Sequence, residues 1–153
     1  MINENVFLLC QNVRSALENS SKSDHSCRCS LGIADFPHGC CGDTSEILQW
    51  LLNEKLGIET VYCSGIYYSD EVKESEVSSG SSHAWLELND TIIDITADQF
   101  NDRGFSHPDV MVSDNKIFHD MFSESTIRRK CSTKLHEGLH KTVAYLERVL
   151  PRN

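Results

Sequence analysis

Two adjacent cysteines, Cys40 and Cys41, follow a turn that contains proline and glycine and precede a helical pattern. The triplet Asp43-Thr-Ser45 comes next and supplies residue types that cap helix N-termini. Exposed backbone N–H groups and the positive end of the helix dipole stabilise a thiolate at such a position. Because Cys41 lies directly before the glycine and aspartate that open the helix, we predict that Cys41, rather than Cys40, is a nucleophile.

A histidine and an aspartate follow in two strand-like runs. His83 begins the alternating run His-Ala-Trp-Leu-Glu-Leu, and Asp94 lies among isoleucines. A carboxylate in an apolar strand is costly to bury unless another group hydrogen-bonds to it, and a histidine on the neighbouring strand would do so. A cysteine at a helix start, then a strand histidine, then a strand aspartate is the order of a Cys-His-Asp catalytic triad. The pattern therefore predicts a triad of Cys41, His83 and Asp94.

Two further side chains are candidates for a substrate pocket. Trp85 shares the strand face of His83 by the two-residue period, so it would shield the Cys-His pair, line an acyl pocket, or simply pack in the core. Gln99 follows the second strand, where a glutamine more often caps a turn than touches substrate.

These residues need a helix and a sheet to position them. Hydrophobic residues recur with helical spacing in the segments 3–19, 44–56 and 133–150. Strand-like runs occupy 58–68, 83–88 and 91–95, with shorter ones at 110–112 and 116–118. An Asn-Asp turn at 89–90 would join two of the strands as an antiparallel hairpin. We expect an α+β fold in which the nucleophile helix packs on an antiparallel sheet, with the N- and C-terminal helices completing the cover.

Two segments are less regular. The stretch 69–82 is acidic and rich in serine, and it is predicted to be an exposed connection, with a substrate-facing lid as the alternative. The stretch 120–132 is compatible with either a helix or a strand.

Length and charge limit the classes of function. A chain of 153 residues suits one domain with a core, so a single domain over 1–153 is expected. The net charge of −9 argues against nucleic-acid binding. No run approaches the roughly 20 apolar residues that span a bilayer, and the N-terminus lacks the basic start of a secretory signal. We expect a cytoplasmic protein without membrane contact, with delivery to a host or another cell as an effector as the alternative.

Two patterns offer metal-binding alternatives. His136-Glu137-Gly-Leu-His140 matches the His-Glu-x-x-His signature of zinc hydrolases, but Gly138 weakens the helix and no third ligand follows at a recognisable distance. Cys27-x-Cys29 with the adjacent cysteine pair lacks the usual spacing of zinc sites. The seven cysteines are odd in number and irregularly spaced, which is typical of free thiols in a reducing compartment. We expect neither a metal nor another cofactor.

The segment from Phe36 to Phe100 resembles the transglutaminase-like and papain-like cysteine hydrolases. The resemblance lies in Gly39-Cys-Cys-Gly-Asp-Thr-Ser45 before a helix, in His83-Ala-Trp85 with Glu87, and in Ile93-Asp-Ile-Thr96. The pattern ending in Asp-Ile-Thr-Ala-Asp-Gln-Phe also looks like that of a small group of bacterial proteins. The resemblance implies a papain- or transglutaminase-like core, with Cys41 as nucleophile, His83 as general base and Asp94 as the group that orients the imidazole.

The same resemblance implies a protein or peptide substrate with a carboxamide and a thioester intermediate. Transfer to water would make the protein a peptidase, an amidase or a glutamine deamidase, and transfer to an amine would make it a transglutaminase or an N-acyltransferase. No glutamine ahead of Cys41 suits a papain-type oxyanion hole, so the Cys41 backbone N–H and another group are the expected donors. The rival from another class is a non-enzymatic interaction module that uses the acidic surface. The sequence leaves the substrate, the acceptor and the oligomeric state open.

Overall fold

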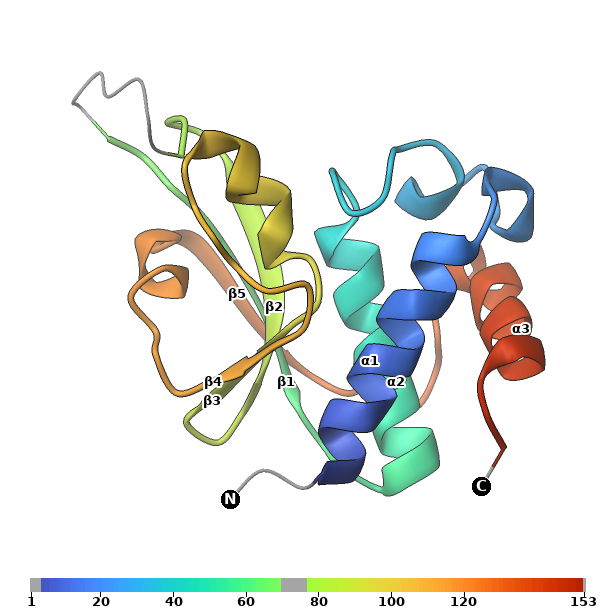
Figure 1. Ribbon diagram of the computed structural model, residues 1–153. Coiled ribbons are helices and arrows are strands. Elements are labelled where there is room, and N and C mark those ends of the chain that lie inside the picture. Colours follow the sequence, from blue (N-terminus) through green and yellow to red (C-terminus); the bar gives the residue numbers. More distant parts are fainter. Residues whose placement is uncertain (1–3, 70–76, 153) are drawn as a thin grey trace.

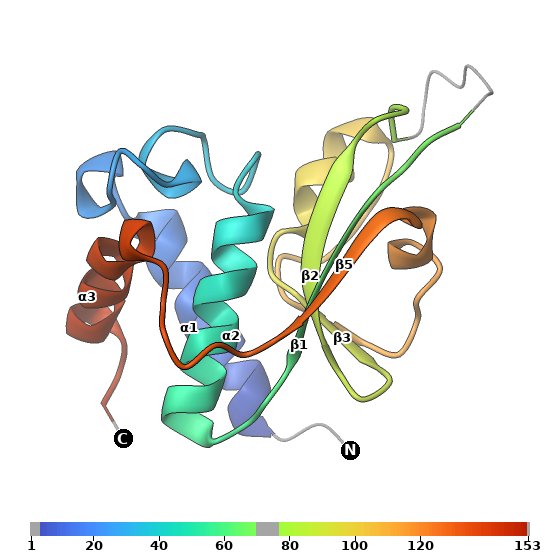
Figure 2. The same ribbon diagram turned by 180° about the vertical axis from the view of Figure 1, so that it is seen from behind.

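The structure, a computed structural model, describes residues 4–69 and 77–152 and has an α+β architecture, which confirms the predicted class. Three α-helices, α1 (Glu4–Asn19), α2 (Cys41–Leu56) and α3 (His140–Val149), lie together on one side of the sheet in the described part of the chain (Figure 1). The 3-10 helix η4 (His119–Met121) lies on its other side (Figure 2), and η3 (Ala97–Arg103) contributes Ala97 and Phe100 to the hydrophobic cluster there. The sheet is therefore covered on both faces.

The sheet has five antiparallel strands in the order β4-β3-β2-β1-β5. Their bounds are β1 Val61–Ile66, β2 Ser82–Leu88, β3 Thr91–Asp94, β4 Met111–Ser113 and β5 Glu124–Lys130. β2 and β3 form the predicted hairpin, in which Leu88 pairs with Thr91 across a turn whose Asn89 has a φ of 54°. β2 is the central strand and is buried from His83 to Leu86, so the sheet holds His83 at the middle of the molecule.

Hydrophobic side chains form one cluster on each face of the sheet. Ala84 and Leu86 belong to the larger cluster, which they share with residues of α1 and α2. Trp85 belongs to the second cluster, with Phe118 and Phe122. The alternation of side chains along β2 thus divides them between two cores, which explains why a strand with alternating polarity is buried on both faces.

Helix α2 ends where the sequence predicts and begins earlier. Gly57 adopts the left-handed conformation with a φ of 64°, and its N–H bonds to the Asn53 carbonyl while the Ile58 N–H bonds to that of Leu52. These bonds satisfy carbonyls at the end of the helix, as expected of a glycine at this position. At its start the helix includes Cys41, with Cys40 as the N-cap residue, whereas the pattern had placed the start near Thr44.

Other boundaries differ from the sequence-based expectations. Residues 116–118 are not a strand, because side-chain bonds at Ser113 and Asn115 turn the chain and Phe118 has helical dihedral angles. The ambiguous stretch 120–132 contains β5, whose seven residues are all exposed and therefore show no alternation of polarity. The last helix begins at His140 rather than Thr133, after a turn and the 3-10 helix η5 (Glu137–Leu139).

Two shorter 3-10 helices, η1 (Lys22–Asp24) and η2 (Ser30–Gly32), lie in the connection between α1 and α2. The predicted loop 69–82 lies partly outside the described residues, which resume at Val77. Its described ends are joined by two backbone hydrogen bonds between Tyr67 and the pair Gly80 and Ser81.

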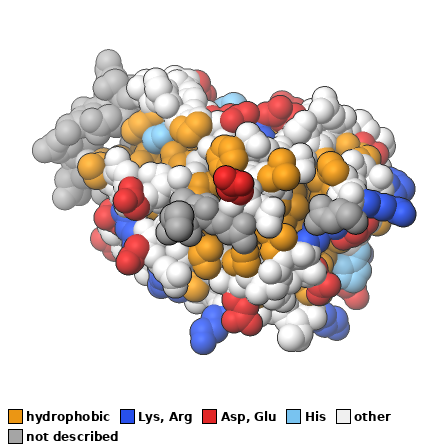
Figure 3. Space-filling view, turned by 60° about the horizontal axis from the view of Figure 1, so that its bottom comes forward, with side chains coloured by type: hydrophobic (Ala, Val, Ile, Leu, Met, Phe, Trp, Pro, Cys, Tyr) orange, Lys and Arg blue, Asp and Glu red, His pale blue; other side chains and the backbone are white. Residues whose placement is uncertain are grey.

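The surface carries charges of both signs. On the face seen in Figure 3, acidic and basic side chains are interspersed, and hydrophobic side chains lie between them. Within the described residues, no helix has the length and apolar character needed to cross a membrane.

Candidate active site

Cys41 stands at the N-terminus of α2, as the first residue of the helix. The first N–H groups of a helix have no acceptor within it, so those near Cys41 are available to a group bound there. The loop in front of the helix is attached to its first turn by Asp43, whose Oδ2 accepts bonds from the Ser30 N–H at 2.8 Å and the Ser30 hydroxyl at 2.7 Å. The carboxylate that was predicted as a cap therefore fixes the cysteine loop instead.

The Cys41 side chain interacts with the His83 ring and with the backbone N–H of Ala84, and both stabilise its thiolate. Burial opposes the thiolate, but these interactions and the charge of His83 outweigh it, so the pKa of Cys41 is lowered. The adjacent Cys40 behaves in the opposite way, because burial raises its pKa to about 11. The electrostatic setting thus favours Cys41 over Cys40 as a nucleophile.

His83 connects Cys41 to Asp94. The ring is 1% exposed, and its Nε2 lies 2.7 Å from Oδ2 of Asp94. Because Nε2 is used in this way, Nδ1 is the nitrogen available to the thiol. Burial opposes a charged imidazole, but the Asp94 carboxylate and the Cys41 thiolate outweigh it and raise the pKa of His83. The arrangement therefore stabilises a thiolate–imidazolium pair.

Asp94 is fully enclosed, and both of its oxygens have partners. Oδ1 accepts the Thr96 backbone N–H at 2.9 Å and lies 3.4 Å from the Thr96 hydroxyl. Oδ2 accepts the bond from His83. Burial opposes the carboxylate, but the two neighbouring histidines outweigh it and hold the pKa of Asp94 far below its usual range. The structure brings the three predicted triad residues together.

His119 is a fourth member of the network that the sequence did not reveal. It lies in η4, is 2% exposed, and its Nε2 is 2.7 Å from the same Oδ2 of Asp94. Its Nδ1 is buried without a hydrogen-bond partner among the described residues. The one signal in the sequence was indirect: a buried carboxylate has room for several donors, but spacing does not show which of the seven histidines supplies the second one.

Gln99 lies between the cysteine loop and the imidazole. Its Nε2 donates to the Thr96 carbonyl at 3.0 Å and lies 3.4 Å from Nδ1 of His83. Its Oε1 accepts the Gly39 N–H at 3.4 Å. Gln99 therefore closes a turn, as expected, and also places an amide group beside the Cys-His pair.

Trp85 packs beneath the site. It is 6% exposed, its ring is stacked on that of His83 with 5.8 Å between ring centres, and its ring centre lies 4.9 Å from that of His119 in an edge-to-face arrangement. These contacts support the packing interpretation, while its role as the wall of a substrate pocket stays a prediction.

The sequence-based zinc motif does not assemble. His136 precedes the helix in an extended conformation and accepts the Gly138 N–H, while His140 bonds to the Leu135 carbonyl.

Among the described residues, the one group with metal-binding donor types in reach is His83, Asp94 and His119, whose ligand atoms lie within 4.8 Å of one another. Both imidazoles already contact Asp94 at hydrogen-bond distance, so the cluster fits shared protons better than a cation. The pairs Cys27, Cys29 and Cys40, Cys41 form no such group in the part of the chain that the structure describes.

No known protein family, curated protein or solved structure matches this chain. The function must therefore be argued from the geometry of these residues.

Proposed function

We propose that this protein is a cysteine-dependent acyl-transfer enzyme that acts on a carboxamide, with a core of the papain-like and transglutaminase-like kind. The observation that carries the proposal is the continuous chain of contacts from Cys41 at a helix N-terminus through His83 to Asp94. This arrangement provides a nucleophile, a base and an orienting carboxylate in the order that acyl transfer needs. A protein or peptide with a side-chain or backbone amide is the substrate class.

The reaction would proceed in two stages. The Cys41 thiolate attacks the amide carbon to form a carbon–sulfur bond, and the tetrahedral intermediate collapses as the carbon–nitrogen bond breaks. The leaving amine takes the proton from Nδ1 of His83. Water then attacks the thioester while His83 accepts its proton, the carbon–sulfur bond breaks, and the thiolate is restored. An amine in place of water would give transamidation, and hydrolysis is the default because water is always present.

The oxyanion of the intermediate needs donors near Cys41. Its own backbone N–H is one candidate, since it lies in the first turn of the helix. The amide of Gln99 is the second, because it already lies against His83 and Gly39. Asp94 would keep the imidazole in one orientation and stabilise its charged form throughout.

The proposal predicts that Cys41 reacts with iodoacetamide much faster than the other thiols at pH 6 to 7. Its pKa is lowered, so the thiolate persists as the pH falls below the ordinary thiol pKa of about 8.5. Rates at each cysteine are read by peptide mass spectrometry between pH 5 and 9. The exposed Cys27 serves as the internal reference in the same sample.

His83→Ala should remove this advantage by losing the positive partner of the thiolate, and Cys41→Ala should abolish labelling at this position. A matched control is His140→Ala, which removes an exposed histidine remote from Cys41 in the sequence. Equal labelling of Cys41 in the parent and in His83→Ala would contradict the proposed pair and favour an interaction module.

A further inference from the structure

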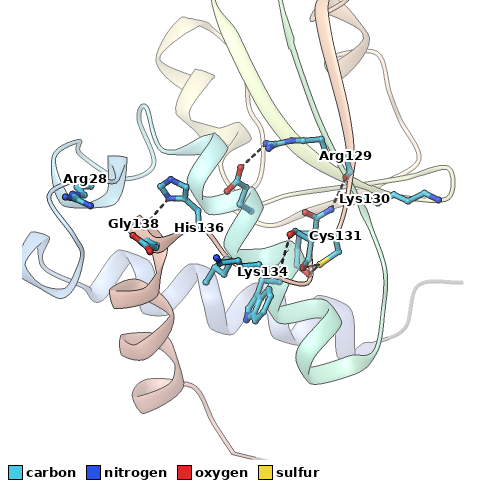
Figure 4. A pocket seen from close by; sticks show the side chains of 13 residues that line it. Arg28, Arg129, Lys130, Cys131, Lys134, His136 and Gly138 are labelled. Carbon is cyan, nitrogen blue, oxygen red and sulfur yellow. Dashed lines mark hydrogen bonds and ion pairs between the residues drawn. The ribbon is translucent and has the colours of Figure 1, made fainter.

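A groove with a volume of about 640 Å³ runs across α2. One wall is formed by α2, with the half-buried Glu46 and Trp50 and the buried Gln49, and the other is the chain from Arg129 to Gly138. Arg28, from the connection before α2, lies at the far end, so that Arg28 and Arg129 lie on opposite sides of the helix (Figure 4). The groove is therefore an elongated site with charged ends.

Positive charge gathers along this groove although the whole chain has a net charge of −9. Arg28, Arg129, Lys130 and Lys134 line it, against the two carboxylates of Glu46 and Glu137. Arg129 bonds to Glu46 at 2.8 Å, which leaves Arg28 and Lys134 without an ion-pair partner in the described ranges 4–69 and 77–152. The Lys130 side chain extends away from the others (Figure 4). Two exposed, unpaired cations on one groove favour an anionic ligand.

Two sets of contacts link the groove to the first turn of α2, where Cys41 lies. On one side, Arg28 precedes Ser30, which is bonded to Asp43 in that turn. On the other side, the Arg129 guanidinium lies 4.4 Å from the centre of the Tyr62 ring, and a Cβ atom built on Gly42 would lie 3.4 Å from the Tyr62 hydroxyl. Cys41 does not line the groove itself, but Ser30 and Tyr62 connect the two sides of the groove to the turn that carries Cys41.

We infer that this groove, which we name the α2 groove, binds an acidic segment of a peptide or protein substrate beside the amide that Cys41 attacks. The inference rests on the proposed function. Because Arg28 and Arg129 lie at opposite sides of α2, a small anion would contact one of them, whereas an extended chain with several carboxylates would contact both as well as Lys134 between them. The half-buried ring of Trp50 gives the same chain an apolar contact.

The test measures binding without turnover. The full chain with Cys41→Ala is titrated into three fluorescein-labelled decapeptides of alternating sequence, Glu-Ser, Gln-Ser and Lys-Ser, and fluorescence anisotropy is recorded. The Glu-Ser peptide should bind at least about tenfold more tightly than the Gln-Ser peptide, and its affinity should fall as salt is added. Equal affinity for these two peptides would overturn the inference.

The location is tested with two double variants that remove the same charge from exposed positions. Arg28→Gln with Lys134→Gln should weaken binding of the Glu-Ser peptide by roughly tenfold. Lys141→Gln with Arg148→Gln on α3, outside the α2 groove, should change it less than about twofold. Equal losses in both variants would show general attraction to the surface and overturn the site.

Two further comparisons separate the groove assignment from other kinds of ligand and from the proposed function. Tighter binding of a ten-nucleotide thymidine strand than of the Glu-Ser peptide would overturn the peptide assignment. Because none of these measurements uses Cys41 reactivity, peptide binding with an unreactive Cys41 would contradict the proposed function and leave the groove assignment in place. A reactive Cys41 without peptide binding would contradict the groove assignment and leave the proposed function in place.

Discussion

At the scale of single residues, the distinctive feature of the site is that Asp94 serves two imidazoles through one oxygen. His83 and His119 both lie 2.7 Å from Oδ2, and Thr96 occupies Oδ1. A buried carboxylate with this many donors is held in one orientation, since any rotation would break several bonds at once. The orientation of His83 toward Cys41 therefore depends on groups from β3 and from η4.

Replacing His119 with phenylalanine should lower the free energy of unfolding by about 1–3 kcal/mol, because a buried charged acceptor loses one donor. Phenylalanine keeps the aromatic packing against Trp85 and Phe118. A depressed carboxyl pKa stabilises the folded state above the unfolded value of about 3.9 and ceases to do so as the pH falls through the folded value. The unfolded-state pKa is the same in both proteins and the variant has a smaller depression, so its deficit should be constant above the folded-state pKa of Asp94 in the variant and shrink as the pH falls through that value.

The measurement is urea unfolding of the parent and of His119→Phe from pH 3 to pH 7. His119→Gln, which offers an amide donor, should recover part of the loss at neutral pH. A deficit in His119→Gln as large as that in His119→Phe would assign His119 a packing role only.

At the scale of elements, Gly65 of β1 closely approaches the residue that follows η4. Gly65 pairs with His83 across the strands, and a Cβ atom built on it would lie 1.9 Å from the Phe122 carbonyl oxygen. Phe122 follows η4 directly, and its ring centre lies 5.5 Å from that of His83. The glycine that interrupts an otherwise regular strand pattern thus makes room for the segment that carries His119.

Gly65→Ala should therefore destabilise the protein by about 3 kcal/mol or more, because backbone rather than a flexible side chain must move. The change should also slow iodoacetamide labelling of Cys41, since it displaces the contacts of His83 and His119. Ser64→Ala, a neighbour in the same strand, is the matched control and should leave both quantities nearly unchanged. Thermal unfolding and peptide mass spectrometry report the two effects, and an unchanged melting temperature in Gly65→Ala would contradict the packing argument.

At the scale of the whole molecule, Arg14 of α1 connects the helices to the opposite face of the sheet. It is 5% exposed, bonds to both carboxylate oxygens of Asp98 at 2.7 Å, and donates to the Ile95 carbonyl at 2.7 Å. Asp98 lies in η3, next to Gln99. The ion pair therefore fixes the segment after Asp94 against the first helix.

Arg14→Met should lower the free energy of unfolding by about 3 kcal/mol. This loss is near the low end of the range for breaking a buried ion pair, because the Asp98 side chain is 18% exposed. Lys22→Met removes a cation from the exposed pair of Lys22 with Asp35 and should cost less than about 1 kcal/mol. Chemical denaturation of both variants gives the comparison. Equal losses would mean that Arg14 does not join the two layers.

The sequence predicted the parts of this molecule that depend on local patterns. The hairpin followed from alternation and the Asn-Asp turn, the end of α2 from Gly57, and the pairing of His83 with Asp94 from the cost of a lone buried carboxylate. The contacts of His119, Arg14 and Gly65 join segments that are 25, 84 and about 57 residues apart, and no local pattern encodes such distances. β5 escaped prediction because a fully exposed strand has no buried face to mark it.

That exposed strand also has a consequence for self-association. β5 pairs with β1 on one side and forms the edge of the sheet, so its other side presents backbone groups on which a strand of a second molecule could add. Its end carries the consecutive cations Arg128, Arg129 and Lys130, and repulsion between like-charged edges opposes such pairing. Two of these cations also line the α2 groove. Changes that neutralise Arg129 and Lys130 in the groove would therefore remove a safeguard against aggregation.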